Sequence, residues 1–133
     1  MTLGPSGGLG TSAAGVHALS ENFLHTVEAY TTYLAHLGPD GVLAVTAWLT
    51  VPPREAVRTI LTSAAAVRRR APTAVERALV VARGWGTATV LVKPSGFTEA
   101  ELKALQGWAR DRRFDLDWYP GLDRGISEFN FLA

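Results

Sequence analysis

Apolar side chains recur at spacings of three and four residues over positions 23–37, which places them on one face of a helix. They are Phe23, Val27, Tyr30, Leu34 and Leu37. Polar residues open the stretch, and a Gly-Pro-Asp-Gly turn at 38–41 ends it, because proline cannot continue a helix and Asp-Gly favours a turn. The pattern predicts an amphipathic helix over residues 20–37.

Residues 41–49, which follow, are almost continuously apolar and lack the alternation of a strand that is exposed on one side. Strands of this kind are typically buried on both faces, as in parallel sheets that helices cover. We therefore expect a buried strand directly after the first helix. Together the two elements make half of an α/β repeat.

A second helix is predicted over residues 53–70, because a proline suits its first turn and the arginines at 68–70 suit the negative end of the helix dipole. Two β-rich runs follow, at 76–83 and 87–93. The Gly-Trp-Gly segment at 84–86 lies between them, so an antiparallel hairpin is predicted.

Thr98 and Glu101 have the spacing of a capping box, which predicts a third helix over residues 99–112. A short alternating strand is expected at residues 114–119. The tryptophans of the hairpin turn and of the third helix are expected to lie in the core: Trp85 and Trp108.

The order of helix, Pro-Asp-Gly turn and buried strand over residues 20–50 resembles the fifth-strand region of Rossmann-like S-adenosylmethionine enzymes, specifically the spermidine synthase-like family. Four further segments carry the resemblance: Trp48, residues 52–55 (PPRE), residues 83–89 (RGWGTAT) and residues 97–101 (FTEAE). The resemblance covers nearly the whole chain. It implies an α/β fold that corresponds to the C-terminal half of a Rossmann-like methyltransferase or spermidine synthase-type sheet, with a terminal antiparallel hairpin.

The length of 133 residues suits a single domain. We expect residues 1–19 to form a glycine-rich flexible loop and residues 20–133 a partial Rossmann-like α/β domain of three helices and about four strands. A hydrophobic content of 47% argues against disorder, and a net charge of +1 offers no strong field for nucleic acid or an anionic membrane. No apolar run is long enough to cross a bilayer, and no leader pattern is recognisable, so a cytoplasmic location without membrane contact is expected.

The family's cofactor loop is not recognisable in this chain. Residues 8–13 (GLGTSA) match the loose pattern G-x-G-x-x-A, but a dinucleotide fingerprint requires a buried strand before it and an acidic strand end about 20 residues later. Only residues 1–7 precede the pattern, and the acidic candidate Glu28 falls inside the predicted first helix. We therefore expect no cofactor to be bound by this chain alone.

The resemblance also implies an acidic motif after the fourth strand, whose first carboxylate orients the attacking amine. The chain has no acidic residue before Glu21, so aminopropyl transfer by this chain alone lacks its carboxylate. No catalytic residue is assigned, and whether the chain is an enzyme stays open. A complete parent protein would use decarboxylated S-adenosylmethionine or S-adenosylmethionine, and the amine or methyl acceptor is not determined by the sequence.

Five residues are candidates for lining a substrate or cofactor pocket: Ser20, Glu21, Trp48, Thr50 and Arg54. Ligands of open α/β sheets bind beyond the carboxyl ends of the strands, and the predicted loops lead to that side. Four of these candidates also have an ordinary structural explanation. Ser20 and Glu21 suit a helix cap, Trp48 a cover for the sheet edge, and Arg54 an exposed first helical turn.

Other site chemistry is not supported by the motifs. The three histidines, His17, His25 and His36, lack the spacing and the carboxylate of a metal site, so no metal is predicted. The chain also has no G-x-S-x-G elbow and no G-K-[ST] after its glycine cluster. The absence of cysteine excludes disulfides and thiolate chemistry.

Two hypotheses follow from the sequence. The first is a fragment of a spermidine synthase-like protein, of polyamine aminopropyltransferase or methyltransferase type, which is inactive alone. The second is a non-catalytic interaction or oligomerisation module derived from that fold. A half-sheet leaves a strand edge and an apolar face open, so the expected partner is a missing N-terminal half or a second copy in a homodimer.

Overall fold

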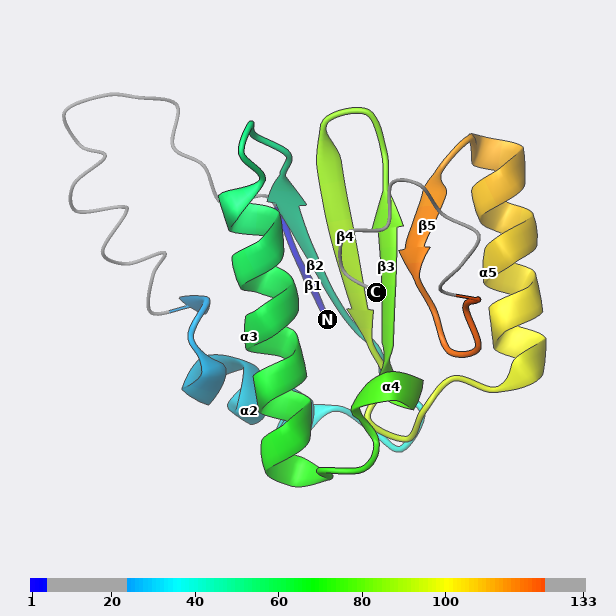
Figure 1. Cartoon of the computed structure of the whole chain (residues 1–133). Helices are drawn as coiled ribbons and strands as arrows, with labels where there is room; N and C mark the ends of the chain where they lie inside the picture. Colours follow the sequence, from blue (N-terminus) through cyan, green and yellow to red (C-terminus); the bar gives the residue numbers. More distant parts are fainter. Residues whose placement is uncertain (5–23, 124–133) are drawn as a thin grey trace, which may run out of the picture.

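The structure is a computed structural model that describes residues 1–4 and 24–123, and these form a mixed α/β domain (Figure 1). Its five-stranded sheet has the order β1-β2-β4-β3-β5, and four helices accompany it in the described ranges. The elements are β1 (Thr2–Leu3), α2 (Val27–His36), β2 (Leu43–Trp48), α3 (Arg54–Arg70), α4 (Val75–Ala78), β3 (Leu79–Arg83), β4 (Thr87–Val92), α5 (Glu99–Arg112) and β5 (Asp115–Trp118).

Strand β4 lies in the middle of the sheet and runs antiparallel to both of its neighbours. Its residue Val90 pairs with Val45 of β2 on one side and with Val81 of β3 on the other. The predicted hairpin between β3 and β4 is therefore confirmed. Strand β1 runs parallel to β2, and β5 extends the sheet on the far side by pairing antiparallel with β3.

Helices α2 and α3 pack against each other, and α3 lies over β2 and β4 (Figure 1). The core forms between these helices and one face of the sheet. Its larger buried residues are Tyr30, Leu34, Leu43, Val45, Val67, Leu79, Val81, Val90 and Val92. The predicted apolar face of the first helix is confirmed at Tyr30 and Leu34, which are 1% and 2% exposed.

Strand β2 is less buried than the sequence predicts. Leu43, Val45 and Ala47 are buried, whereas the alternate residues are partly or largely exposed. On that second face the hydroxyls of Thr46 and Thr89 share a hydrogen bond of 2.9 Å. The expectation of two buried faces is wrong because helices α2 and α3 both pack on the face that carries the core.

Helix α2 begins at Val27 rather than at residue 20. The hydroxyl of Thr26 accepts a hydrogen bond of 3.1 Å from the backbone N–H of Ala29, so Thr26 is the N-cap. The rest of the expected first turn, residues 20–23, lies outside the described residues. The side chain of Thr26 satisfies a backbone N–H in the first turn and so marks where the helix begins. The spacing of the apolar residues alone did not locate this cap.

Two further expectations about element bounds are wrong. Thr2 and Leu3 form a strand inside the predicted loop of residues 1–19, because the backbone pairs with β2 and the Met1 carbonyl accepts from the N–H of Ala44 at 2.8 Å. Residues 5–19 of that loop lie outside the described residues. The predicted strand at 76–83 opens with the short helix α4, and pairing begins only at Leu79, opposite the last residue of β4.

The two tryptophans expected in the core are exposed. Trp85 is 102% exposed at the tip of the β3–β4 hairpin, where the two flanking glycines carry it beyond the sheet. Trp108 is 46% exposed on α5, and its ring stacks on that of Phe114 with the centroids 4.9 Å apart. Both predictions relied on side-chain hydrophobicity, which does not report whether another element covers the residue.

Lys93, just after β4, joins three parts of the domain. Its side chain is only 4% exposed, and its Nζ donates to Glu101 Oε1 at 2.6 Å, with Asp40 Oδ1 3.8 Å away. Glu101 also accepts from the backbone N–H of Thr98 at 2.8 Å, which confirms the predicted capping box at the start of α5. The buried ammonium thus holds the first turn of α5 against the sheet.

We expect this ion pair to make stability depend on pH. The pKa of Glu101 lies below its ordinary value of 4.5, first because of the hydrogen bond from Lys93 and then because of that from the Thr98 backbone. A carboxyl whose pKa is lower in the folded state contributes stability above the unfolded pKa and loses it as pH falls through the folded pKa. Urea unfolding of the wild type should therefore show a decline below about pH 4.5 that is shallower in Lys93→Met. Parallel declines would contradict this role.

A second prediction concerns the close approach of Phe114 to Gly84. A β-carbon on Gly84 would lie 2.8 Å from a ring carbon of Phe114, whose ring is already stacked on Trp108. Gly84→Ala should therefore lower the free energy of unfolding by about 1–3 kcal/mol. Gly86→Ala, two residues away and with nothing within 4 Å, is the matched control and should be nearly neutral. Equal effects in thermal unfolding would refute the steric explanation.

Candidate functional site

The carboxyl ends of the parallel strands β1 and β2 point to the same edge of the sheet, and the β3–β4 hairpin turns there as well. Trp48, the last residue of β2, is opposite Thr87, the first of β4. One residue later the backbone N–H of Leu49 donates to the carbonyl of Gly86 at 2.9 Å, so the two loops are fastened together. This end of the domain is the candidate functional site.

Three predicted site residues lie in or next to the loop that joins β2 to α3: Trp48 ends β2, Thr50 lies in the loop, and Arg54 begins α3. Trp48 is 45% exposed at the start of this loop. The hydroxyl of Thr50 donates to the carbonyl of Pro52 at 2.9 Å, and the backbone N–H of Arg54 donates to the same carbonyl at 2.8 Å. Thr50 therefore stabilises the conformation of the loop in which it lies. The other two candidates, Ser20 and Glu21, lie outside the described residues.

Two exposed residues at this end were not predicted as site residues, and one of them, Trp85, was expected in the core. Val51 and Trp85 are each fully exposed, and the bond between Leu49 and Gly86 keeps their loops adjacent. We call Trp48, Val51 and Trp85 the apolar rim. The position of Trp85 between two glycines in a hairpin turn could have indicated its exposure, because a residue in a turn lies beyond the strands and outside the core.

The charged groups beside the hairpin are engaged with each other. Arg83 Nε donates to both carboxylate oxygens of Asp117, at 2.9 and 3.1 Å, and Arg83 Nη2 lies 3.2 Å from Asp115 Oδ2. The hydrogen bond with Asp117 raises the pKa of Arg83 above its ordinary value, with the charges of Asp117 and Asp115 acting in the same direction. This cluster ties β3 to β5 and pairs the carboxylates of Asp115 and Asp117 with the Arg83 guanidinium.

The described histidines have local partners. His25 Nδ1 shares a hydrogen bond of 2.8 Å with the hydroxyl of Tyr30, and burial raises the pKa of that phenol. His36 Nδ1 donates to the carbonyl of Thr32 at 2.8 Å. Within residues 1–4 and 24–123, no three histidine, aspartate or glutamate side chains gather so that they could hold a metal ion. His17 lies outside these ranges.

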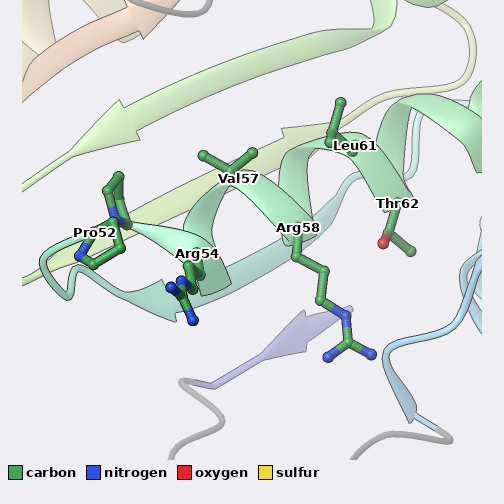
Figure 2. A pocket seen from close by; sticks show the side chains of 7 residues that line it. Pro52, Arg54, Val57, Arg58, Leu61 and Thr62 are labelled. Atoms are coloured by element: carbon green, nitrogen blue, oxygen red, sulfur yellow. The ribbon is translucent and has the colours of Figure 1, made fainter.

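A shallow groove of about 450 Å³ begins at this edge and continues along α3 (Figure 2). It starts at Pro52 and Pro53, directly after the apolar rim, and runs to Leu61 and Thr62. Its lining is mostly apolar, with Arg54 among the exceptions. The helices of the described part are too short or too polar to cross a membrane.

We expect the rim to be dispensable for folding. Trp85→Ser should leave the melting temperature unchanged, because the side chain contacts solvent on all sides. Trp118→Ala is the comparison, since Trp118 packs partly buried against the core, and it should cost about 2 kcal/mol or more. Differential scanning calorimetry of both variants measures this difference. A melting point lowered as much by Trp85→Ser would show that Trp85 has a structural role.

The described side chains at this end of the domain form an apolar surface with some hydrogen-bonding groups. They do not place an acid and a base around a common point. That arrangement suits the binding of a ligand or a partner. Comparison of the chain with protein-family models, with curated proteins and with solved structures found no match. The structure itself shows a mixed α/β domain.

Proposed function

We propose that the domain is the carboxyl-terminal half of a Rossmann-like, S-adenosylmethionine-type protein that resembles the spermidine synthases. The observation that supports this proposal is the strand order. Strands β2 and β3 run in the same direction, α3 crosses between them, and the reversed strand β4 is inserted between the two. The resemblance implies a reversed hairpin of this kind at the end of the sheet, whereas here β5 extends the sheet beyond the hairpin by pairing with β3.

The place of β1 is consistent with the same proposal. It continues the parallel part of the sheet beyond β2, and among the described strands it pairs with β2 alone. Further parallel strands would add at its other edge. In open α/β sheets ligands bind beyond the carboxyl ends of such strands, and Trp48, Thr50 and Arg54 lie there.

The residues of this chain do not fit a complete site for the cofactor that the family implies. The sequence after β1 contains no carboxylate before Glu21, and Asp115 and Asp117 are bound by Arg83. Positioning an ammonium nucleophile requires a carboxylate within hydrogen-bond distance. The proposed role is therefore to supply one wall of a nucleoside or polyamine pocket that a complementary half completes, and no catalytic step is assigned to this chain.

A non-catalytic interaction module is the second candidate, and the apolar rim favours it. Fully exposed Val51 and Trp85 beside half-exposed Trp48 form an apolar surface of the kind that marks contact sites. This candidate requires no ligand, and it assigns the rim and the outer edge of β1 to a partner protein or a second copy. The two candidates differ in what completes the domain.

Calorimetric titration with methylthioadenosine and with S-adenosylmethionine tests the first proposal. The chain alone should give no saturable heat up to about 1 mM, because it supplies only one wall. Mapping the transcript should reveal a neighbouring coding segment with a G-x-G-x-G loop. The chain joined to that segment, or mixed with its product, should bind methylthioadenosine.

In that completed protein Trp48→Ala should weaken binding by about tenfold, as expected for an aromatic anchor. Lys103→Ala is the control, because Lys103 is 73% exposed on α5 and belongs to no proposed site. Saturable heat from the chain alone would overturn the half-site proposal. A transcript without such a segment, together with a stable dimer in sedimentation equilibrium, would replace it by the interaction module.

A further inference from the structure

The outer side of α3 carries two neighbouring rows of side chains with a spacing of four residues. The apolar row consists of Pro53, Val57 and Leu61. The polar row consists of Arg54, Arg58 and Thr62. In Figure 2 Val57 and Leu61 point to one side of the helix, and Arg54 and Arg58 point to the other. The groove described above is lined by both rows.

This groove lies on the face of α3 that is turned away from the sheet. The buried residues of α3 are Ala56, Thr59, Ser63, Ala66 and Val67. Leu61, in contrast, is 63% exposed, and Val51 at the end of the groove is fully exposed. A single exposed leucine is ordinary, but here it continues an apolar row that is half-buried at Val57.

Rows with i, i+4 spacing are the ridges through which helices pack, and the groove between two such rows accepts a ridge of a second helix. From Pro53 to Thr62 the groove follows α3 for about 15 Å at the rise of an α-helix. That length suits two to three turns of a partner helix. The shape of the surface therefore indicates a helical occupant.

The charges on α3 restrict the occupant further. Arg54 and Arg58 lie in the polar row, Arg68 and Arg70 lie in the last turn of the helix beside Arg69, which pairs with Glu28 at 2.9 Å, and no carboxylate lines the groove. A second copy of α3 would bring arginines against arginines. None of the described helices carries two acidic residues four apart, so these helices offer no acidic row to a neighbouring copy.

We propose that the outer groove of α3 binds an amphipathic helix of a partner protein, whose apolar ridge lies along Val57 and Leu61 and whose acidic row faces Arg54 and Arg58. Nucleic acid has no apolar ridge to offer these side chains, and a flat lipid surface does not fill a groove. The groove shares Arg54 with the proposed pocket wall, but Val57, Leu61 and Thr62 lie farther along α3, so the helix site does not require the proposed enzyme half.

The probe is a fluorescein-labelled synthetic helix of about 18 residues, long enough to span the groove, with leucine and glutamate in adjacent i, i+4 rows. Its control has lysine in place of every glutamate. Fluorescence anisotropy with the full chain should show saturable binding of the acidic peptide and none of the lysine peptide. Both arms use the same protein, so the difference reports charge complementarity.

Leu61→Ser and Arg54→Glu should each weaken binding of the acidic peptide by about tenfold, because one removes the apolar contact and the other reverses the facing charge. Lys103→Ala, on exposed α5, should bind as the wild type does. Circular dichroism checks that the variants are folded, which is expected because Leu61 and Arg54 are exposed.

Four outcomes would overturn the proposal. The first two are the absence of saturable peptide binding up to about 1 mM and equal affinity for the acidic and the lysine peptide. The other two concern other occupants of the groove. Sedimentation of the chain with anionic phosphatidylglycerol vesicles that is lost in Leu61→Ser would assign the groove to lipid. A dimer that dissociates in Leu61→Ser would assign it to a second copy.

Discussion

The domain depends on strand β4, because β4 is the one described strand that is paired along its length with long strands on both sides. Val45, Val90 and Val81 lie side by side across β2, β4 and β3, and each is at most 1% exposed. This row provides the apolar surface on which α3 packs, and α3 in turn supports α2. Without β4 no strand would join the parallel pair β1-β2 to the outer pair β3-β5. Helix α3 would then lose the sheet surface on which it packs.

The outer elements are attached in a different way. Helix α5 has Ala109 as its one buried residue, and its first turn is held through the hydrogen bond between Lys93 and Glu101. Strand β5 is joined to β3 by backbone pairing and by the contact of Arg83 with Asp117. Charged contacts of this kind are directional and depend on pH. The apolar packing beneath α3 is not directional and does not depend on pH. The centre and the outer side of the domain are thus stabilised by different forces.

The same packing leaves two apolar surfaces uncovered. The apolar rim lies where the strands end, because the loops after β2 and β3 project beyond the layers that bury the core. The groove on α3 is uncovered because a helix that packs on a sheet with one side presents its opposite side to solvent. The first surface is placed where α/β proteins bind ligands, and the second combines apolar residues with arginines. Their different chemistry is the reason for assigning them to different partners.

Local patterns in the sequence determined much of the domain. The capping box of Thr98 and Glu101, the spacing of Tyr30 and Leu34, and the glycines around Trp85 each depend on residues a few positions apart, so helix, helix face and hairpin were predictable. Trp48, Thr50 and Arg54 were placed at one edge for the same reason. The exposure of Trp85 and Trp108, the pairing of Thr2 and Leu3 with β2, and the burial of Lys93 were decided only by the tertiary structure. Each depends on which distant segment covers or pairs with the residue, and this is a property of packing that no short stretch of sequence contains.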